Sequence, residues 1–292
     1  MARKTSVSTT VIYIILVFFT IICLAPIINI VSISLSESSE AIAGNVYFMP
    51  KRFTLASYER ILSESAFTQA FMVSVIRIIA AVAVSLPVMI CMAYALSKSK
   101  RVFRERDIVM WIAVFTMLFN GGLIPTYIII KNYGLINNFW VLILPLVMNV
   151  FNMIIMMNFF RGVPLELEEA AIIDGAGILR TMVSVYLPIS LPTLATITLF
   201  TIVNHWNDFF WGMIYMDNPV NYPLQTYIRS LTIPTDLLTS TMDPALLAEY
   251  IKINSITFNA SKIVISMLPI LLVYPFLQRY FVSGLVMGAV KE

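Results

Sequence analysis

Six long apolar stretches constrain this chain more than any other feature, because each needs an apolar environment on most of its faces. They cover residues 11–33, 71–96, 108–130, 139–160, 193–216 and 263–281. The first is 23 residues long, enough to cross a hydrocarbon core about 30 Å thick at about 1.5 Å per residue. In hydrocarbon the backbone must satisfy its own hydrogen bonds, so stretches of this kind form helices. The sequence therefore predicts an all-α integral membrane protein with about six spans.

The composition agrees with a fold that is surrounded by lipid. Charged residues make up 12% of the chain and hydrophobic residues 59%, whereas soluble domains carry roughly one quarter charged residues. The basic residues occur in short groups beside apolar stretches, so no nucleic-acid partner is expected. Cys23 and Cys91 each lie inside an apolar stretch, which predicts small buried side chains and no disulfide.

The N-terminus resembles a signal peptide only in part. Arg3 and Lys4 precede the first apolar stretch, but this stretch is longer than the apolar core of a signal peptide. No small-residue cleavage pattern follows it promptly. We therefore expect it to remain as the first span.

The distribution of basic residues predicts the orientation of the chain. Five of them lie between the second and third stretches: Lys98, Lys100, Arg101, Arg104 and Arg106. Such loops stay in the cytoplasm, and with an even number of spans both termini lie there too, with eleven basic residues inside against seven outside. The prediction is a multi-pass protein of the cytoplasmic (inner) membrane. Arg77, near the outer end of the second stretch, is expected to snorkel towards the headgroups.

The loop between the fourth and fifth stretches, residues 162–192, reads GVPLELEEAAIIDGAGILRTMVSVYLPISLP. Pro164 suits the first turn of a helix, where a missing N–H costs nothing. Three acidic residues crowd that turn, where the helix dipole favours negative charge: Glu166, Glu168 and Glu169. Gly175 and Gly177 should end the helix with a left-handed residue, and a second apolar helix should run over 178–187 and end before Pro188. We expect a short helix, a glycine hinge and a second helix on the cytoplasmic face.

This loop resembles the EAA loop of ABC importer permeases. The residues that carry the resemblance, followed by Leu187-Pro188, are Glu169, Ala170, Ala171, Asp174, Gly175 and Ala176. In that family the loop forms a coupling helix that docks into a cleft of the cytoplasmic ATPase subunit. One departure is Met182-Val183-Ser184, where many members carry an aromatic residue and a lysine, which leaves the fit of the second helix open.

Four further runs extend the resemblance over nearly the whole chain, at residues 119–127, 205–208, 222–225 and 274–281. They are similar to the carbohydrate-uptake branch, and closest to the polysaccharide-type permeases related to the smaller maltose importer permease. That branch usually has a lysine where this chain has Ser283.

The resemblance implies a type I ABC importer permease bundle of six transmembrane helices, with residues 1–292 as a single transmembrane permease domain. It also implies a heterodimer with a second homologous permease subunit, two cytoplasmic ATPase subunits and an extracytoplasmic sugar-binding protein. No cofactor is expected on this chain, since ATP and Mg would be bound by the ATPase subunits.

A polar cluster stands about halfway through the fifth stretch and forms, with Asn152 of the fourth, the candidate substrate path: Asn204, His205, Trp206, Asn207 and Asp208. Ionisable groups in a membrane are costly and suggest function, and an aromatic face beside amides suits a sugar. The other interpretation is hydrogen bonding between helices, worth roughly 0.6 kcal/mol per bond. For Asp208 the structural interpretation is favoured, with His205 as its partner.

Two asparagine positions have a structural interpretation as well. Asn149 and Asn152 share a face of the fourth stretch, where contacts between helices are favoured over ligand binding. Asn120-Gly121-Gly122 interrupts the third stretch, and its glycines allow a close helix contact or an unwound turn.

Other classes of function fit the sequence less well. A proton-coupled secondary transporter needs a relay of ionisable groups at depth, for which only His205 and Asp208 qualify. A single histidine excludes a multi-histidine metal site, and no GxSxG or GxxxxGK[ST] motif indicates a nucleophile or a phosphate loop. A membrane scaffold leaves the EAA loop unexplained. The sequence therefore predicts a permease that imports an oligosaccharide or another sugar by alternating access and is not an enzyme, with a non-sugar solute as the alternative cargo.

Overall fold

The computed structural model describes residues 7–230 and 256–289, with side chains described as far as Pro275. Every regular element in these ranges is a helix, as predicted. The chain divides into two compact units, Met1–Thr68 with Ile228–Pro269, and Gln69–Tyr227 with Ile270–Glu292. Of the residues named above, Arg3 and Lys4 lie outside the described residues. The motif side chains beyond Pro275, and that of Ser283, lie outside the described side chains.

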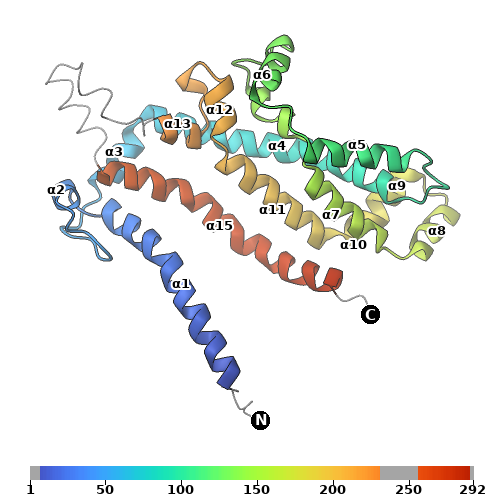
Figure 1. Ribbon diagram of the computed structural model, residues 1–292, viewed down its shortest axis with the longest axis horizontal. Helices are drawn as coiled ribbons and strands as arrows, with labels where there is room; N and C mark the ends of the chain where they lie inside the picture. The colour runs from blue at the N-terminus through green and yellow to red at the C-terminus, as the bar shows by residue number, and fades with distance from the viewer. Residues whose placement is uncertain (1–6, 231–255, 290–292) are drawn as a thin grey trace. The chain divides into compact units, whose positions relative to one another are not determined.

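The first unit contains α1 (Val7–Ser34), α2 (Ser38–Ile42), α3 (Ala56–Ser63) and the beginning of α15 (Ile256–Ala289) (Figure 1). The most apolar window of α1 is not buried by protein at all, as expected of a helix that lipid surrounds. Cys23 on this helix is exposed, and so is Cys91, so the prediction that both cysteines are buried side chains is wrong, because these faces of their helices are not covered by protein. Hydroxyl groups join α15 to the N-terminal segment: Ser38 and Thr257 are 2.7 Å apart, and Ser261 donates to the carbonyl of Ser34 at 3.2 Å.

Three helices among the described residues are long and apolar enough to span a membrane without interruption: Thr9–Ser34, Ser65–Ser97 and Ile256–Pro275. Three further spans are bent pairs of helices, at 116°, 48° and 86°. Counting each pair as one span gives up to six, in agreement with the prediction. The first two bends break the third and fourth stretches, and the third bend lies just before the fifth stretch begins.

The break in the third stretch lies between α5 (Arg106–Leu118) and α6 (Leu123–Asn132). Gly122 has φ +89°, and its N–H donates to the side chain of Asn120 at 2.8 Å. Only glycine adopts this backbone region at little cost. The unwound turn predicted at Asn120-Gly121-Gly122 is therefore confirmed.

The break in the fourth stretch separates two 3-10 helices, η1 (Phe139–Leu142) and η2 (Leu144–Leu146), from α7 (Val150–Arg161). Pro145 lies at the start of η2 and has no N–H to continue a longer helix. Asn149 caps α7 and accepts the N–H of Asn152 at 3.1 Å. Asn149 thus serves the helix terminus, one of the structural uses of asparagine.

The fifth stretch was predicted as a helix over 193–216, and that prediction is wrong at its centre. The helix α11 (Leu191–Asn207) ends at Asp208, whose backbone is extended and whose carboxylate accepts the N–H of Phe210 at 3.2 Å. The next helix, α12 (Phe210–Tyr215), begins there. The polar cluster consequently stands at the C-terminal end of α11 and not halfway along a helix.

The second unit is built around α4 (Ser65–Ser97), which packs with α5, α7 and α11 (Figure 1). One apolar cluster surrounds the C-terminal half of α4 and includes Met89, Ala93, Met153, Met156 and Phe160. A second cluster joins Ala81 to residues 141–143 and to Tyr215 and Met216. Unbranched methionines fill irregular gaps between helices, which suits a bundle whose spans are broken.

Candidate functional site

The loop after α7 folds as predicted in its first half. The helix α8 (Leu165–Ile173) follows Pro164 and ends at Asp174, and Gly175 then adopts φ +79°. A side chain at this φ is strained, so the glycine hinge is required by the backbone. Short helix and hinge are both confirmed.

The second helix of the loop is longer than predicted. It comprises α9 (Ile178–Thr181), a π-helical segment η3 (Met182–Tyr186) and α10 (Leu187–Ile189), and so continues past Pro188. The N–H of Leu187 donates to the carbonyl of Met182, five residues back. This wider turn changes the hydrogen-bond register just before the proline, so Pro188 does not end the helix.

The predicted coupling residues share one short surface. Glu169, Ala170, Asp174 and Gly175 are exposed, and Ala171 and Ala176 are half-buried. Apolar side chains beside them are exposed as well, with Leu165 at 60%, Ile172 at 57% and Ile173 at 85%. An apolar patch with acidic neighbours on a helix of this kind is suited to contact another protein.

Glu168, also on α8, points away from this exposed surface and into the second unit. Its carboxylate accepts from Lys98 Nζ at 2.7 Å and from the Tyr186 hydroxyl at 2.6 Å. Partial burial raises the pKa of Glu168, but hydrogen bonds from Lys98 and Tyr186 and the Lys98 charge outweigh it and hold the pKa below its ordinary value. The carboxylate therefore stays charged and paired at neutral pH. From the sequence, Lys98 was assigned only to the charge bias of its loop, because no local pattern links residues 70 positions apart.

The predicted path residues at the end of α11 do not form one group. His205 and Trp206 are buried, at 4% and 2% exposure, whereas Asn204 and Asn207 are exposed. Trp206 packs edge-to-face on Phe71, with ring centroids 5.9 Å apart. The indole is therefore held in the packing between α4 and α11.

Asp208 forms an ion pair with Arg77, not with His205 as predicted. Arg77 Nη2 lies 2.6 Å from Asp208 Oδ2, and the Arg77 side chain is fully buried. Its other nitrogens donate to the carbonyls of Leu142 and Asp208, both at 3.2 Å. The expectation that Arg77 snorkels is thus wrong, because a guanidinium surrounded by acceptors gains more in the protein than at the headgroups.

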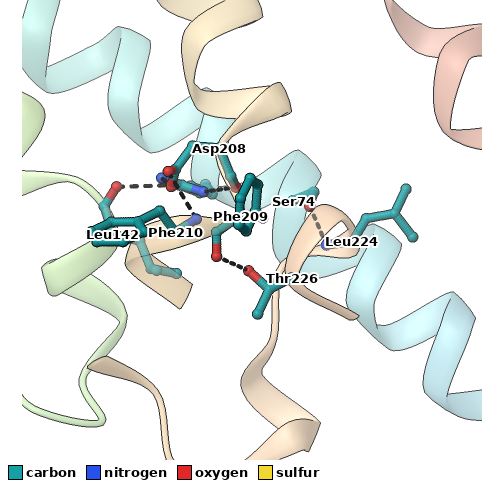
Figure 2. Close-up of polar contacts among 8 residues, drawn as sticks. Ser74, Leu142, Asp208, Phe209, Phe210, Leu224 and Thr226 are labelled. Atoms are coloured by element: carbon teal, nitrogen blue, oxygen red, sulfur yellow. Dashed lines mark hydrogen bonds and ion pairs between the residues drawn. The ribbon is translucent and has the colours of Figure 1, made fainter. Parts of the chain in front are cut away.

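Further hydrogen bonds fix the same region, where α11 breaks (Figure 2). Thr226 donates to the carbonyl of Phe209 at 2.9 Å, and the N–H of Leu224 donates to Ser74 at 2.7 Å. Both join α13 (Leu224–Ser230) to the rest of the second unit. The break after α11 is thereby supplied with partners for the carbonyls of Asp208 and Phe209, as hydrocarbon demands.

A small cavity in the second unit gathers three of the predicted path residues: Asn152, Asn204 and His205. Ser85, Asn149 and Thr201 complete its polar lining, with Met89 and Leu146 as the apolar part. Among the described residues, His205 Nδ1 and Ser85 Oγ are buried without a hydrogen-bond partner. The space suits about one water molecule or hydroxyl group. Ser85 and Thr201 were missed because hydroxyl residues are common in membrane helices, where they bond to their own backbone.

Comparison with known proteins places these features in a family. Residues 65–287 match the family described as the binding-protein-dependent transport system inner membrane component. Two relatives from Bacillus subtilis (strain 168) are similar over most of the chain. The polygalacturonan/rhamnogalacturonan transport system permease protein YtcP is 36% identical and covers 96% of each chain. Protein LplC is 39% identical over 92% of this chain and 90% of its own.

A solved structure agrees with the sequence comparison. A chain of a bacterial ABC transporter, described as involved in the import of the acidic polysaccharide alginate, superposes with a TM-score of 0.84 and 32% identity. The match covers 96% of this chain and 99% of the other. The broken helices and the loop at 162–192 therefore belong to a known membrane architecture.

Proposed function

This chain belongs to the family of binding-protein-dependent transport system inner membrane components, and from that membership we propose that it is the permease subunit of an ABC importer for an oligosaccharide. Family members are transport permeases of the inner membrane and not enzymes, so no bond chemistry is assigned to this chain. Relatives named for polygalacturonan, rhamnogalacturonan and arabinooligosaccharide transport support a carbohydrate cargo.

The observation that carries the proposal is the folded loop with its exposed patch. Its apolar and acidic surface on α8, followed by the left-handed Gly175, supports docking of an ATPase subunit at Glu169, Ala170, Ala171, Asp174, Gly175 and Ala176. Closure of the ATPase dimer would move α8, and the attached spans would open the path to the outside. Hydrolysis would then return the spans to the inward-facing arrangement.

The cavity between α4, α7 and α11 supports a place for the substrate path. Asn152, Asn204 and His205 supply amide and imidazole groups that bind hydroxyls, and Ser85 adds one more. Asn207 is exposed beside them. Trp206 and Asp208 have packing and ion-pair partners instead, so we assign them to the structure of the bundle.

The assembly that follows has the whole chain, residues 1–292, as one permease domain. Its partners would be a second homologous permease, two cytoplasmic ATPase subunits that bind ATP and Mg, and an extracytoplasmic sugar-binding protein. This chain itself would hold no cofactor.

Co-purification and uptake test the proposal together. A tagged chain extracted from its native membrane should retain a second permease and an ATPase subunit. In proteoliposomes the complex should take up oligosaccharides of galacturonate or arabinose only with ATP inside and the binding protein outside. Purification without an ATPase, or uptake driven by a proton gradient alone, contradicts it and favours a secondary transporter.

Orientation has its own test, because we propose that both termini are cytoplasmic. In a background with Cys23 and Cys91 replaced by alanine, a cysteine at Ser39 should react with an impermeant thiol reagent added to intact cells. A cysteine at Ser99 should react only after the cells are opened. The reverse pattern would place α8 on the side that has no ATPase.

A further inference from the structure

The C-terminal end of α4 is held by an unusual group of contacts around Lys98, the first residue after the helix. Lys98 Nζ donates to Glu168 Oε1 at 2.7 Å and to the Tyr186 hydroxyl at 3.0 Å. The Tyr186 hydroxyl in turn donates to the other oxygen of Glu168 at 2.6 Å. The three side chains close a triangle that joins α4, α8 and η3.

Two aromatic rings enclose the ammonium group of this triangle. Lys98 Nζ lies 4.0 Å from the ring centroid of Tyr94 and 4.2 Å from that of Tyr186. The two rings meet edge-to-face at 5.0 Å. The Lys98 side chain is only 12% exposed, so these cation–π contacts are partly desolvated, the condition in which they are strongest.

Two arginines hold the backbone at the same point. Arg161, the last residue of α7, donates to the carbonyl of Leu96 at 3.1 Å, and Arg106, the first residue of α5, donates to the carbonyl of Lys98 at 3.1 Å. The last carbonyls of a helix lack partners within the helix and attract cations. The end of α4 is therefore bonded to α5, α7, α8 and η3.

The helix α8 has an unequal distribution of contacts. Glu166 and Glu169 are exposed, and so are the apolar residues Leu165 and Ile173. Glu168 is the acidic residue of α8 that faces the unit, with its side chain 16% exposed. A displacement of α8 therefore reaches α4 through the Glu168 carboxylate and the Lys98 ammonium.

We propose that Lys98 is a positioning residue for transport, which transmits movement of α8 to α4 through its ion pair with Glu168. The rings of Tyr94 and Tyr186 around the ammonium, together with Arg161 and Arg106, make η3, α7 and α5 move with the end of α4. This inference rests on the coupling role proposed for α8 and adds the route by which the coupling proceeds. The charged pair is suited to the task, because hydrogen bonds between ionised groups are about twice as strong as neutral ones.

The test compares Lys98→Met with Lys100→Met in the assembled complex. Lys100 is in the same loop, its side chain is 66% exposed, and its partner Asp107 is outside the triangle. Lys98→Met should retain the ATPase subunit and basal hydrolysis, because the exposed face of α8 is unchanged. Uptake per ATP hydrolysed should fall by about tenfold or more, because the variant loses the charge-assisted hydrogen bonds to Glu168 and to the Tyr186 hydroxyl. Lys100→Met should leave ATPase retention, basal hydrolysis and uptake per ATP hydrolysed as in the wild type.

A milder variant keeps the test decisive if Lys98→Met assembles poorly, and a double variant tests whether Lys98 and Glu168 act in one contact. Tyr186→Phe removes only the hydroxyl, which bonds to both the Lys98 ammonium and the Glu168 carboxylate, and it leaves the direct Lys98–Glu168 ion pair in place. Uptake per ATP should therefore fall less than in Lys98→Met, by about threefold. Glu168→Gln added to Lys98→Met should cause little further loss, because both act in one contact. Equal uptake per ATP in the Lys98 and Lys100 variants overturns the inference, and so does a loss of thermal stability with uptake per ATP unchanged. A wild-type chain that retains no ATPase subunit would instead contradict the proposed function.

Discussion

Two basic residues of the span formed by α4 make ion pairs that are built differently: Arg77, which is buried within the helix, and Lys98, which is half-buried just after its C-terminal end. Arg77 and Lys98 are 21 residues apart, about 32 Å at about 1.5 Å per residue, which matches the thickness of the hydrocarbon core. Arg77 is 0% exposed with Asp208 at 13%, and Lys98 is 12% exposed with Glu168 at 16%. One pair therefore lies at each end of the span.

The two basic residues, Arg77 and Lys98, differ in the groups to which they donate hydrogen bonds. Arg77 bonds to two backbone carbonyls, that of Leu142 at the end of η1 and that of Asp208 where the fifth span is broken. The bonds from Lys98 go to side chains, and its carbonyl receives Arg106. A rigid guanidinium on backbone oxygens fixes a fold, whereas a flexible ammonium on side chains can follow a moving helix. In the orientation proposed above, the Arg77–Asp208 pair is the outer pair and serves as an anchor, and the Lys98–Glu168 pair is the inner pair and serves as a joint.

Asp208→Ala should have the largest effect, because it leaves the Arg77 guanidinium buried without its counter-charge. Removing one partner of a buried ion pair costs about 3–5 kcal/mol. We expect a low yield of assembled complex and a lower thermal unfolding midpoint. Asp217→Ala, at an exposed aspartate, is the matched control. A double change, Arg77→Met with Asp208→Leu, should recover part of the stability, and a stable single variant would show that the outer pair is no anchor.

Trp206→Ala should be second, since it removes the indole that packs on Phe71. A large buried aromatic residue replaced by alanine costs on the order of 3 kcal/mol. Uptake, basal ATP hydrolysis and subunit yield should fall together when measured on one preparation. Trp111→Ala, at a position 71% exposed, should leave them unchanged. Lower uptake with full subunit yield would instead assign Trp206 to the substrate path. It would also weaken the conclusion that the residues at this end of the span serve the structure of the bundle.

Gly212→Ala tests how closely the outer end is packed. A Cβ there would lie 2.2 Å from Thr226 Oγ1 and 3.0 Å from Pro223 Cδ. Forcing atoms into a packed contact costs about 1–3 kcal/mol, so the unfolding midpoint should decrease. Gly121→Ala has open space and is the control. Equal midpoints for the two variants would mean that α12 and α13 adjust freely, contrary to a rigid outer end.

Gly175→Val should have the smallest effect on stability, and its effect should be confined to the region of α8 and the Lys98–Glu168 pair. The left-handed φ of +79° disfavours any side chain, and a β-branched one most, at a cost of about 1–2 kcal/mol. The complex should still insert, with less ATPase subunit retained and lower substrate-stimulated hydrolysis. Gly177→Val, at φ −72° with open space around it, should behave as the wild type. Wild-type retention of the ATPase subunit and wild-type substrate-stimulated hydrolysis in Gly175→Val would show that coupling through the Lys98–Glu168 pair does not need the left-handed residue after α8.

Several features could be read from the sequence because their causes are local. Apolar stretches of sufficient length predict helices in lipid, and Gly122 and Gly175 adopt backbone regions that favour glycine. The loop at 162–192 was predicted as a helix and a hinge for the same reason. Two predicted helix bounds were wrong. The helix expected to end before Pro188 continues because a π-helical turn changes the hydrogen-bond register before the proline, and the helix expected over 193–216 is broken at Asp208.

Contacts between distant residues were decided by the tertiary structure alone. Asp208 lies 131 positions from Arg77, and His205 was the nearer candidate only along the chain. The triangle of Lys98, Glu168 and Tyr186 likewise joins segments whose sequences contain no sign of one another. The length of an apolar stretch and the backbone preference of a glycine are properties of one continuous segment of the chain. The partner of a buried charge, in contrast, depends on which helices pack together. The sequence alone therefore determined the spans and the hinge, and the packing of the bundle determined the anchor and the joint.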